Sequence, residues 1–144
     1  MNYLVQQDVI RDYLERYAFI DFAVLFGSHA EKRAGRLSDV DIGIYVSRDL
    51  PLMERGRMIA GLEAILKGDV DIVLLNDSYK ANPVFVFEIL TKGRMLFVRD
   101  QEKFIDFKKN ALQYYMDTQP LRKMVEAALN ARLQSNCFGV RGHV

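Results

Sequence analysis

Hydrophobic and polar side chains alternate along residues 39–46 of the chain. Val40, Ile42, Ile44 and Val46 occupy every second position, with polar or smaller side chains between most of them. Because successive side chains of a β-strand point to opposite faces, this period of two predicts a strand with one buried face.

Other segments show the spacing of amphipathic helices or the short apolar runs of buried strands. Val5, Val9, Tyr13 and Tyr17 recur every fourth residue and predict a helix. Strand and helix alternate along the chain, so we predict an α/β sandwich. In chain order, the predicted elements are helix 3–17, strand 22–26, helix 28–33, strand 39–46, helix 51–67 closed by Gly68, strand 69–75, helix 82–93 and strand 94–99.

Beyond residue 99 the pattern predicts two C-terminal helices, over about residues 100–133. Asp100 caps the first, and Pro120, a residue that suits the first turn of a helix, starts the second. Their apolar residues lie on more than one face, so we expect one side to pack on the core and the other to dock a partner protein or a second copy. Residues 134–144 show no pattern, and we expect a mobile tail there.

Composition narrows the classes to which the protein can belong. Its 144 residues suffice for one domain with its own core, and no linker or repeat marks a boundary. A single cysteine excludes an internal disulfide framework, and neither a signal segment nor a run of roughly 18 apolar residues occurs. The net charge of +1 argues against direct nucleic-acid binding. We therefore expect a soluble, cytoplasmic protein without membrane contacts.

A glycine, a serine and two aspartates occupy the first strand–turn–strand segment. Gly27 ends one strand and lets a ligand approach the backbone closely, and Ser28 starts a helix whose free N–H groups suit a triphosphate. Ten residues further on, Asp39 and Asp41 are two apart on a strand and so share a face. Two adjacent carboxylates repel each other unless a cation lies between them, and carboxylate oxygens at this spacing favour Mg²⁺.

A third carboxylate is available on the strand predicted at 69–75. If this strand is the neighbour of the strand with the two aspartates, Asp71 can join them and hold a second metal ion. Asp69 is the alternative ligand, although its position at the start of the strand favours a role in the turn. We expect Glu88, which lies outside these strands, to be an ordinary surface charge.

Basic residues after Gly27 and Ser28 extend the predicted phosphate site. Lys32 and Arg33, with Arg36 behind them, either contact the phosphates or belong to a solvated helix and turn. The sequence alone leaves both interpretations open.

The combination of these residues resembles the signature of a known family. Gly27-Ser28, a ten-residue spacer and Asp39-x-Asp41 are similar to the motif of the polymerase-β-like nucleotidyltransferase superfamily. The small size resembles the minimal nucleotidyltransferase (MNT) branch, whose best understood members are antitoxins of HEPN/MNT toxin–antitoxin modules. The resemblance covers about residues 1–99 and implies the polymerase-β-like fold, with a small mixed sheet flanked by helices.

The resemblance also implies a reaction and a partner. It implies a single nucleotidyltransferase domain over residues 1–144 that uses ATP and two Mg²⁺ ions, with Asp39 and Asp41 as ligands and Asp71 as the third carboxylate. It further implies that the protein is the antitoxin of a type VII-like module, and that it silences the cognate HEPN ribonuclease toxin by transferring AMP to a tyrosine of that toxin.

One departure from the family pattern keeps two alternatives open. Many minimal members carry Ala-Arg-Gly after Gly-Ser-x, whereas this chain has Ala30-Glu31-Lys32, which puts an anion near the expected phosphates. A catalytically silent antitoxin that neutralises by binding is therefore one alternative.

The other alternative is an antibiotic-type enzyme that acts on a small molecule. Such enzymes usually carry a further helical domain, but only about 45 residues follow the last predicted strand. We therefore expect another protein to supply the acceptor, in a homodimer or hetero-oligomer.

Overall fold

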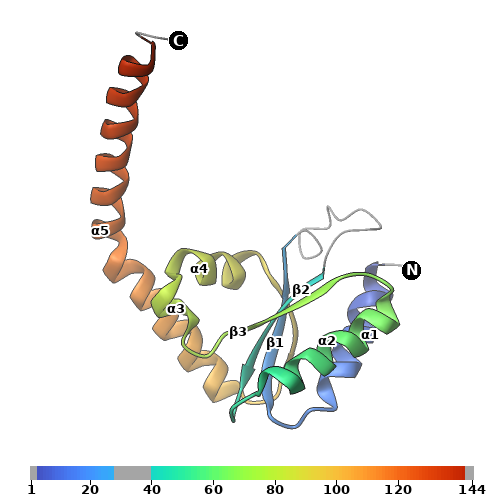
Figure 1. Ribbon diagram of the computed structural model, residues 1–144. Helices are drawn as coiled ribbons and strands as arrows, with labels where there is room; N and C mark the ends of the chain where they lie inside the picture. Colours follow the sequence, from blue (N-terminus) through green and yellow to red (C-terminus); the bar gives the residue numbers. More distant parts are fainter. Residues whose placement is uncertain (1–2, 28–39, 142–144) are drawn as a thin grey trace.

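The computed structural model describes residues 3–27 and 40–141 (Figure 1). The strands form one mixed sheet in the order β3-β2-β1-β4, in which β1 is antiparallel to β2 and β4, and β2 is parallel to β3. This confirms the predicted α/β sandwich, while the helix predicted at 28–33 lies outside the described residues. In chain order, the elements are α1 (Tyr3–Glu15), β1 (Ile20–Phe26), β2 (Val40–Val46), α2 (Leu52–Leu66), β3 (Val70–Leu74), α3 (Ser78–Ala81), α4 (Pro83–Lys92), β4 (Arg94–Val98) and α5 (Gln101–Arg141).

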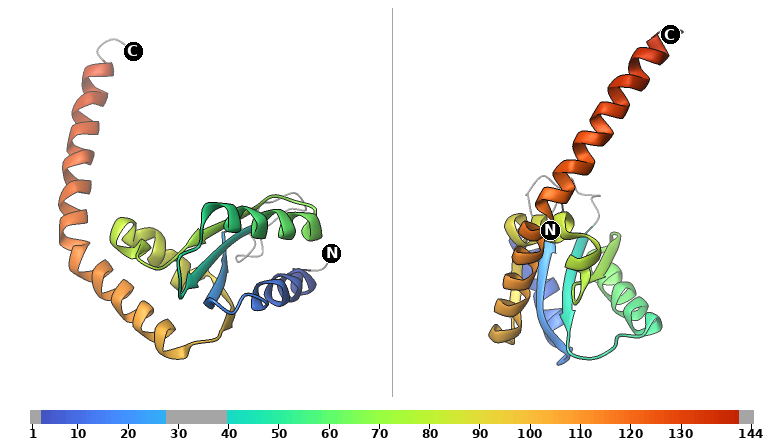
Figure 2. Two further views of the ribbon diagram at one scale, coloured as in Figure 1. Left: turned by 60° about the horizontal axis from the view of Figure 1, so that its bottom comes forward. Right: turned by 90° about the vertical axis from the view of Figure 1, so that its left-hand side faces the viewer.

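Helices cover both faces of the sheet, as Figure 2 shows. Helices α1 and α2 pack on one face, where Ile42 and Ile44 of β2 are fully buried with Leu14 of α1 and Leu62 of α2. The helices α3 and α4 and the first part of α5 pack on the other face, around the buried side chain of Phe22. The alternation predicted for β2 is confirmed, because every second residue from Val40 is buried towards α1 and α2.

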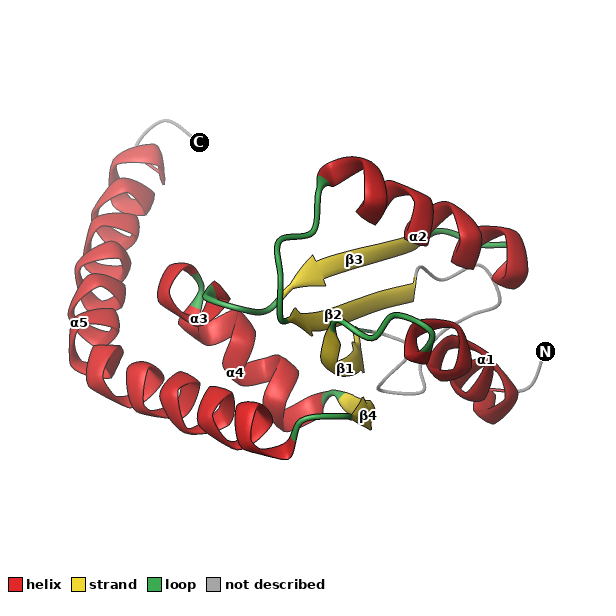
Figure 3. Cartoon of the chain, turned by 90° about the horizontal axis from the view of Figure 1, so that it is seen from below, coloured by secondary structure: helices red, strands yellow, loops and turns green. Residues whose placement is uncertain are grey.

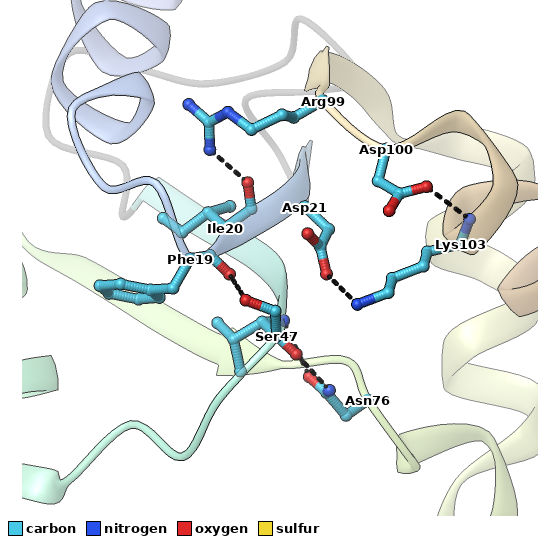
Figure 4. Close-up of polar contacts among 9 residues, drawn as sticks. Phe19, Ile20, Asp21, Ser47, Asn76, Arg99, Asp100 and Lys103 are labelled. Carbon is cyan, nitrogen blue, oxygen red and sulfur yellow. Dashed lines mark hydrogen bonds and ion pairs between the residues drawn. The ribbon is translucent and has the colours of Figure 1, made fainter.

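Polar contacts fix the end of the sheet where β1 begins (Figure 4). The Asp21 carboxylate is 7% exposed and lies 3.3 Å from Nζ of Lys103, at the start of α5. The Asn76 side chain bonds both the N–H and the carbonyl of Val46, and the Arg99 guanidinium donates to carbonyls at the end of α1 and the start of β1. These bonds tie α1, β2 and α5 together at the end of β1 opposite Gly27.

The end of α2 and the presence of α3 differ from the prediction for local reasons. Helix α2 ends at Leu66, and Lys67, not Gly68, adopts the left-handed conformation (φ 56°) that closes it, its N–H bonding the Glu63 carbonyl at 2.7 Å. The four-residue helix α3 was not predicted, because a single turn is too short to show a hydrophobic period.

The predicted break at Pro120 is wrong, since α5 continues from Gln101 through Arg141 with the proline inside it. The same helix includes most of the tail predicted to be mobile. Pro120 removes one backbone donor and crowds the preceding turn, and side chains around it bond the backbone there. Thr118 Oγ1 donates to the Tyr114 carbonyl at 2.8 Å, and Arg122 donates to the Tyr115 carbonyl at 2.8 Å and to the Thr118 hydroxyl. Figure 3 shows that α5 bends, as a proline within a helix explains.

In the part of the chain that the structure describes, no helix has the length and apolar character needed to span a membrane.

Candidate active site

The candidate site begins with the alignment of two aspartates on neighbouring strands. Asp41 of β2 and Asp71 of β3 are partners in the parallel register, so their side chains project from the same face of the sheet. This confirms the condition that β2 and β3 are neighbours. The alternative residue, Asp69, lies two positions before Asp71 and just outside β3, which begins at Val70. Its backbone carbonyl accepts the Val40 N–H at 2.9 Å, as expected for a residue at the edge of a strand.

Gly27 lies directly against the carboxylate of Asp41. Its φ of 79° is in the left-handed region, and a Cβ atom at this position would fall 2.6 Å from Oδ2 of Asp41. Any larger side chain would therefore displace the carboxylate, and the backbone conformation would be strained as well. The glycine predicted to allow close approach to a ligand thus makes a close approach to the candidate metal ligand itself.

A cleft of about 410 Å³ opens at this point between the sheet and α4. Gly27 and the half-buried Asp41 lie on its sheet side. Asp71 does not line this cleft and lies on the adjacent strand β3, where it is exposed. The described residues that line the cleft are Phe26, Gly27, Asp41, Phe85, Glu88, Ile89 and Lys92.

Helix α4 supplies one wall of the cleft, which was not predicted from the sequence. Phe85, Glu88 and Lys92 line the cleft, so Glu88, which is exposed as expected of a surface charge, also faces the candidate site. Their spacing of three and four residues was a signal that the three side chains share one helix face. The sequence could not show which part of the sheet this face covers.

Several predicted site residues fall outside the described residues. They are Ser28, Lys32, Arg33 and Asp39. Their roles, and those of Gly27, Asp41 and Asp71, stay predictions. Within residues 3–27 and 40–141, no group of three His, Cys, Asp or Glu side chains is arranged to hold a metal ion. Asp39 lies outside these ranges, so the predicted group of Asp39, Asp41 and Asp71 stays a prediction.

Solved structures share this fold over most of the chain. A toxin–antitoxin structure with AMP-PNP matches with a TM-score of 0.70 and 23% identity, over 86% of this chain and 97% of that one. A structure of the tri-AMPylated Shewanella oneidensis HEPN toxin in complex with its MNT antitoxin matches with a TM-score of 0.69 and 21% identity, over 89% and 98%. These matches confirm the predicted fold, a small mixed sheet flanked by helices.

Sequence comparisons point to the same family. Protein adenylyltransferase MntA of Shewanella oneidensis is 25% identical over 125 residues, which are 87% of each chain. The model of the family described as "Polymerase beta, Nucleotidyltransferase" matches residues 8–102, more than half of the chain and close to the range over which the motif resemblance was drawn. The chain therefore belongs to the polymerase beta nucleotidyltransferase family.

Proposed function

We propose that the protein is an ATP- and Mg²⁺-dependent protein adenylyltransferase, and that it acts as the antitoxin of a HEPN toxin. The observation that carries the proposal is the contact of Gly27 with Asp41 at the cleft, with Asp71 in register beside it. The similarity to Shewanella oneidensis MntA and to toxin–antitoxin complexes supports both the activity and the partner.

The carboxylates of the site suit magnesium. Asp41 and Asp71 occupy aligned positions on strands that lie roughly 4.8 Å apart, and Asp39 precedes Asp41 by one period of the strand. Carboxylates are the protein ligands that Mg²⁺ prefers, together with water and phosphate oxygens. Bound at these residues, Mg²⁺ would neutralise phosphate charge as a phosphoryl or nucleotidyl group is transferred.

The proposed reaction transfers AMP to a tyrosine hydroxyl. The hydroxyl oxygen forms a bond to the α-phosphorus of ATP, the bond from that phosphorus to the bridging oxygen of the β-phosphate breaks, and pyrophosphate leaves. The hydroxyl proton passes to solvent. The aspartates would hold the Mg²⁺ that orients the triphosphate for this displacement, and the Gly27 backbone leaves room for the phosphates. None of the described side chains of α5 lines the cleft, and we expect the acceptor tyrosine to come from another protein.

ATP binding should depend strongly on magnesium. The carboxylates repel a triphosphate until cations neutralise it, so we expect the affinity for ATP to be at least about tenfold higher in Mg²⁺ than in EDTA. Isothermal titration calorimetry in the two buffers measures this ratio. Equal affinities in both buffers would contradict the proposed site.

A catalytically silent antitoxin is the second candidate, favoured by Glu31 in place of the family arginine. The two candidates differ in cells that express the toxin. An enzyme with the Asp41→Asn substitution should fail to neutralise the toxin, whereas a silent antitoxin with the same change should neutralise it as the wild type does.

The distal half of α5 is the surface on which we expect the toxin to dock. In the first half of α5, Phe107 and Ala111 are buried against the sheet. The second half extends away from the sheet and the other helices (Figures 1 and 2). Val125 and Leu129, one helical turn apart, are each at least half exposed. Exposed apolar side chains in such a row are typical of an interface.

Charged substitutions in this row should therefore separate docking from nucleotide binding. We expect Val125→Glu and Leu129→Glu to weaken toxin neutralisation by about tenfold or more, because each places a charge in an apolar contact. ATP binding should be unchanged in the same proteins. Co-purification with the toxin and calorimetry with ATP measure the two effects. Full neutralisation by both variants would remove this surface from the interface.

A further inference from the structure

Helix α4 presents a row of three side chains to the cleft. Phe85, Glu88 and Lys92 follow one another at three and four residues, so they share the face that lines the cleft with the buried Ile89. The phosphate-binding residues implied by the family motif, Gly27, Ser28, Lys32 and Arg33, all precede β2 in the sequence. The α4 wall is therefore a part of the site that the motif does not account for.

Packing holds this wall in place. On another side of α4, the ring of Phe87 stacks on Tyr115 of α5, with centroids 4.0 Å apart and planes 8° apart. Directly after Lys92, a Cβ on Gly93 would come 3.2 Å from the Leu25 carbonyl oxygen, so the chain packs closely on β1 there. The backbone of Lys92 therefore lies close to Leu25, near the end of β1, and Leu25 is two positions before Gly27.

The charges in the cleft favour one role for Lys92. Among the described residues that line the cleft, Asp41 and Glu88 are anionic and Lys92 is the cationic one. A triphosphate needs cationic partners, and the motif supplies Glu31 where many family members have arginine. Glu88 precedes Lys92 by four residues, but an ion pair between exposed side chains is weak and does not hold the ammonium against a polyphosphate.

We propose that Lys92 binds the phosphates of ATP from the α4 side of the cleft. The inference rests on the proposed function, since it assigns a further contact for the same nucleotide. Lys92 then supplies positive charge opposite the Gly27 turn and offsets part of the loss of the family arginine.

Calorimetry of the Lys92→Gln variant tests this contact with three ligands in Mg²⁺ buffer: ATP, inorganic tripolyphosphate and adenosine. We expect the dissociation constants for ATP and tripolyphosphate to rise by about tenfold, because a charge-assisted contact to phosphate is lost. The affinity for adenosine should not change, since the contact is to phosphate alone.

Three matched variants show whether the effect is specific. Lys92→Arg keeps the charge and should stay within about threefold of the wild type. Lys80→Gln removes the same charge from the exposed α3 helix, outside the cleft, and should bind all three ligands as the wild type does. Glu88→Gln should bind tripolyphosphate equally well or more tightly, because it removes a nearby anion.

The outcomes separate this inference from the proposed function. Unchanged tripolyphosphate affinity in a Lys92→Gln protein with wild-type melting temperature would overturn the inference alone. An equal loss of tripolyphosphate affinity in Lys80→Gln would also overturn the inference alone, because the loss would then follow from the net charge of the protein. A wild-type protein that binds neither ATP nor tripolyphosphate in Mg²⁺ would overturn both the inference and the proposed function.

Discussion

Asparagine at Asp39 and Asp41 should reduce AMP transfer by about a thousandfold or more, without loss of the fold. The substitution removes the negative charges that hold the metal but keeps the size of the side chains. Asp41 is half-buried beside Gly27 and has Asp71 in register, so the substitution relieves repulsion between carboxylates in the metal-free protein. Its melting temperature should be unchanged or slightly higher.

Incorporation of radiolabelled AMP and thermal melting measure these two effects. Asp49→Asn is a matched control, because Asp49 is exposed beyond the far end of β2 from Asp41. We expect the control to transfer AMP at the wild-type rate. A melting temperature lowered by several degrees in the Asp41→Asn protein would indicate a structural role for this carboxylate instead.

Truncation of Phe22 should cause the largest loss of stability. Phe22 is 1% exposed, and its ring lies 4.9 Å from Tyr45, 5.0 Å from Phe104 and 5.5 Å from Phe107, between centroids. The Phe22→Ala change removes this buried surface and leaves a cavity between the sheet and α5. We expect the free energy of unfolding to fall by about 3–5 kcal/mol.

Urea denaturation of Phe22→Ala and of a control measures this loss. Met95→Ala on β4 is the control, because Met95 is 40% exposed and its truncation should cost less than about 1 kcal/mol. A loss below about 1 kcal/mol for Phe22→Ala would show that the contact between the sheet and α5 contributes little to stability.

Regular strands were predictable because their side-chain period is simple. The alternation around Ile42 gave the correct buried face of β2, and the glycine at position 27 lies at the end of a buried strand as expected. The neighbour relation of Asp41 and Asp71 depends on the order of strands in the sheet, which a short sequence pattern does not encode. The sequence therefore predicted that Asp71 joins Asp41 only on the condition that the two strands are neighbours.

Two features escaped prediction because they depend on side-chain contacts and packing that the hydrophobic pattern does not encode. Pro120 normally starts or breaks a helix, but here Thr118 and Arg122 bond the backbone of the preceding turn and α5 continues. Glu88 and Lys92 resemble ordinary exposed charges in the sequence. Only the packing of α4 across the sheet brings them to the same cleft as Asp41.

We propose that the protein transfers AMP from ATP to a HEPN toxin. The most direct test is the intact mass of the toxin encoded beside this protein, after incubation with the protein, ATP and Mg²⁺. We predict that the toxin gains the mass of one or more AMP groups on tyrosine, and that neither EDTA nor the Asp41→Asn protein permits the gain. A toxin that is neutralised while its mass stays unchanged would contradict the account.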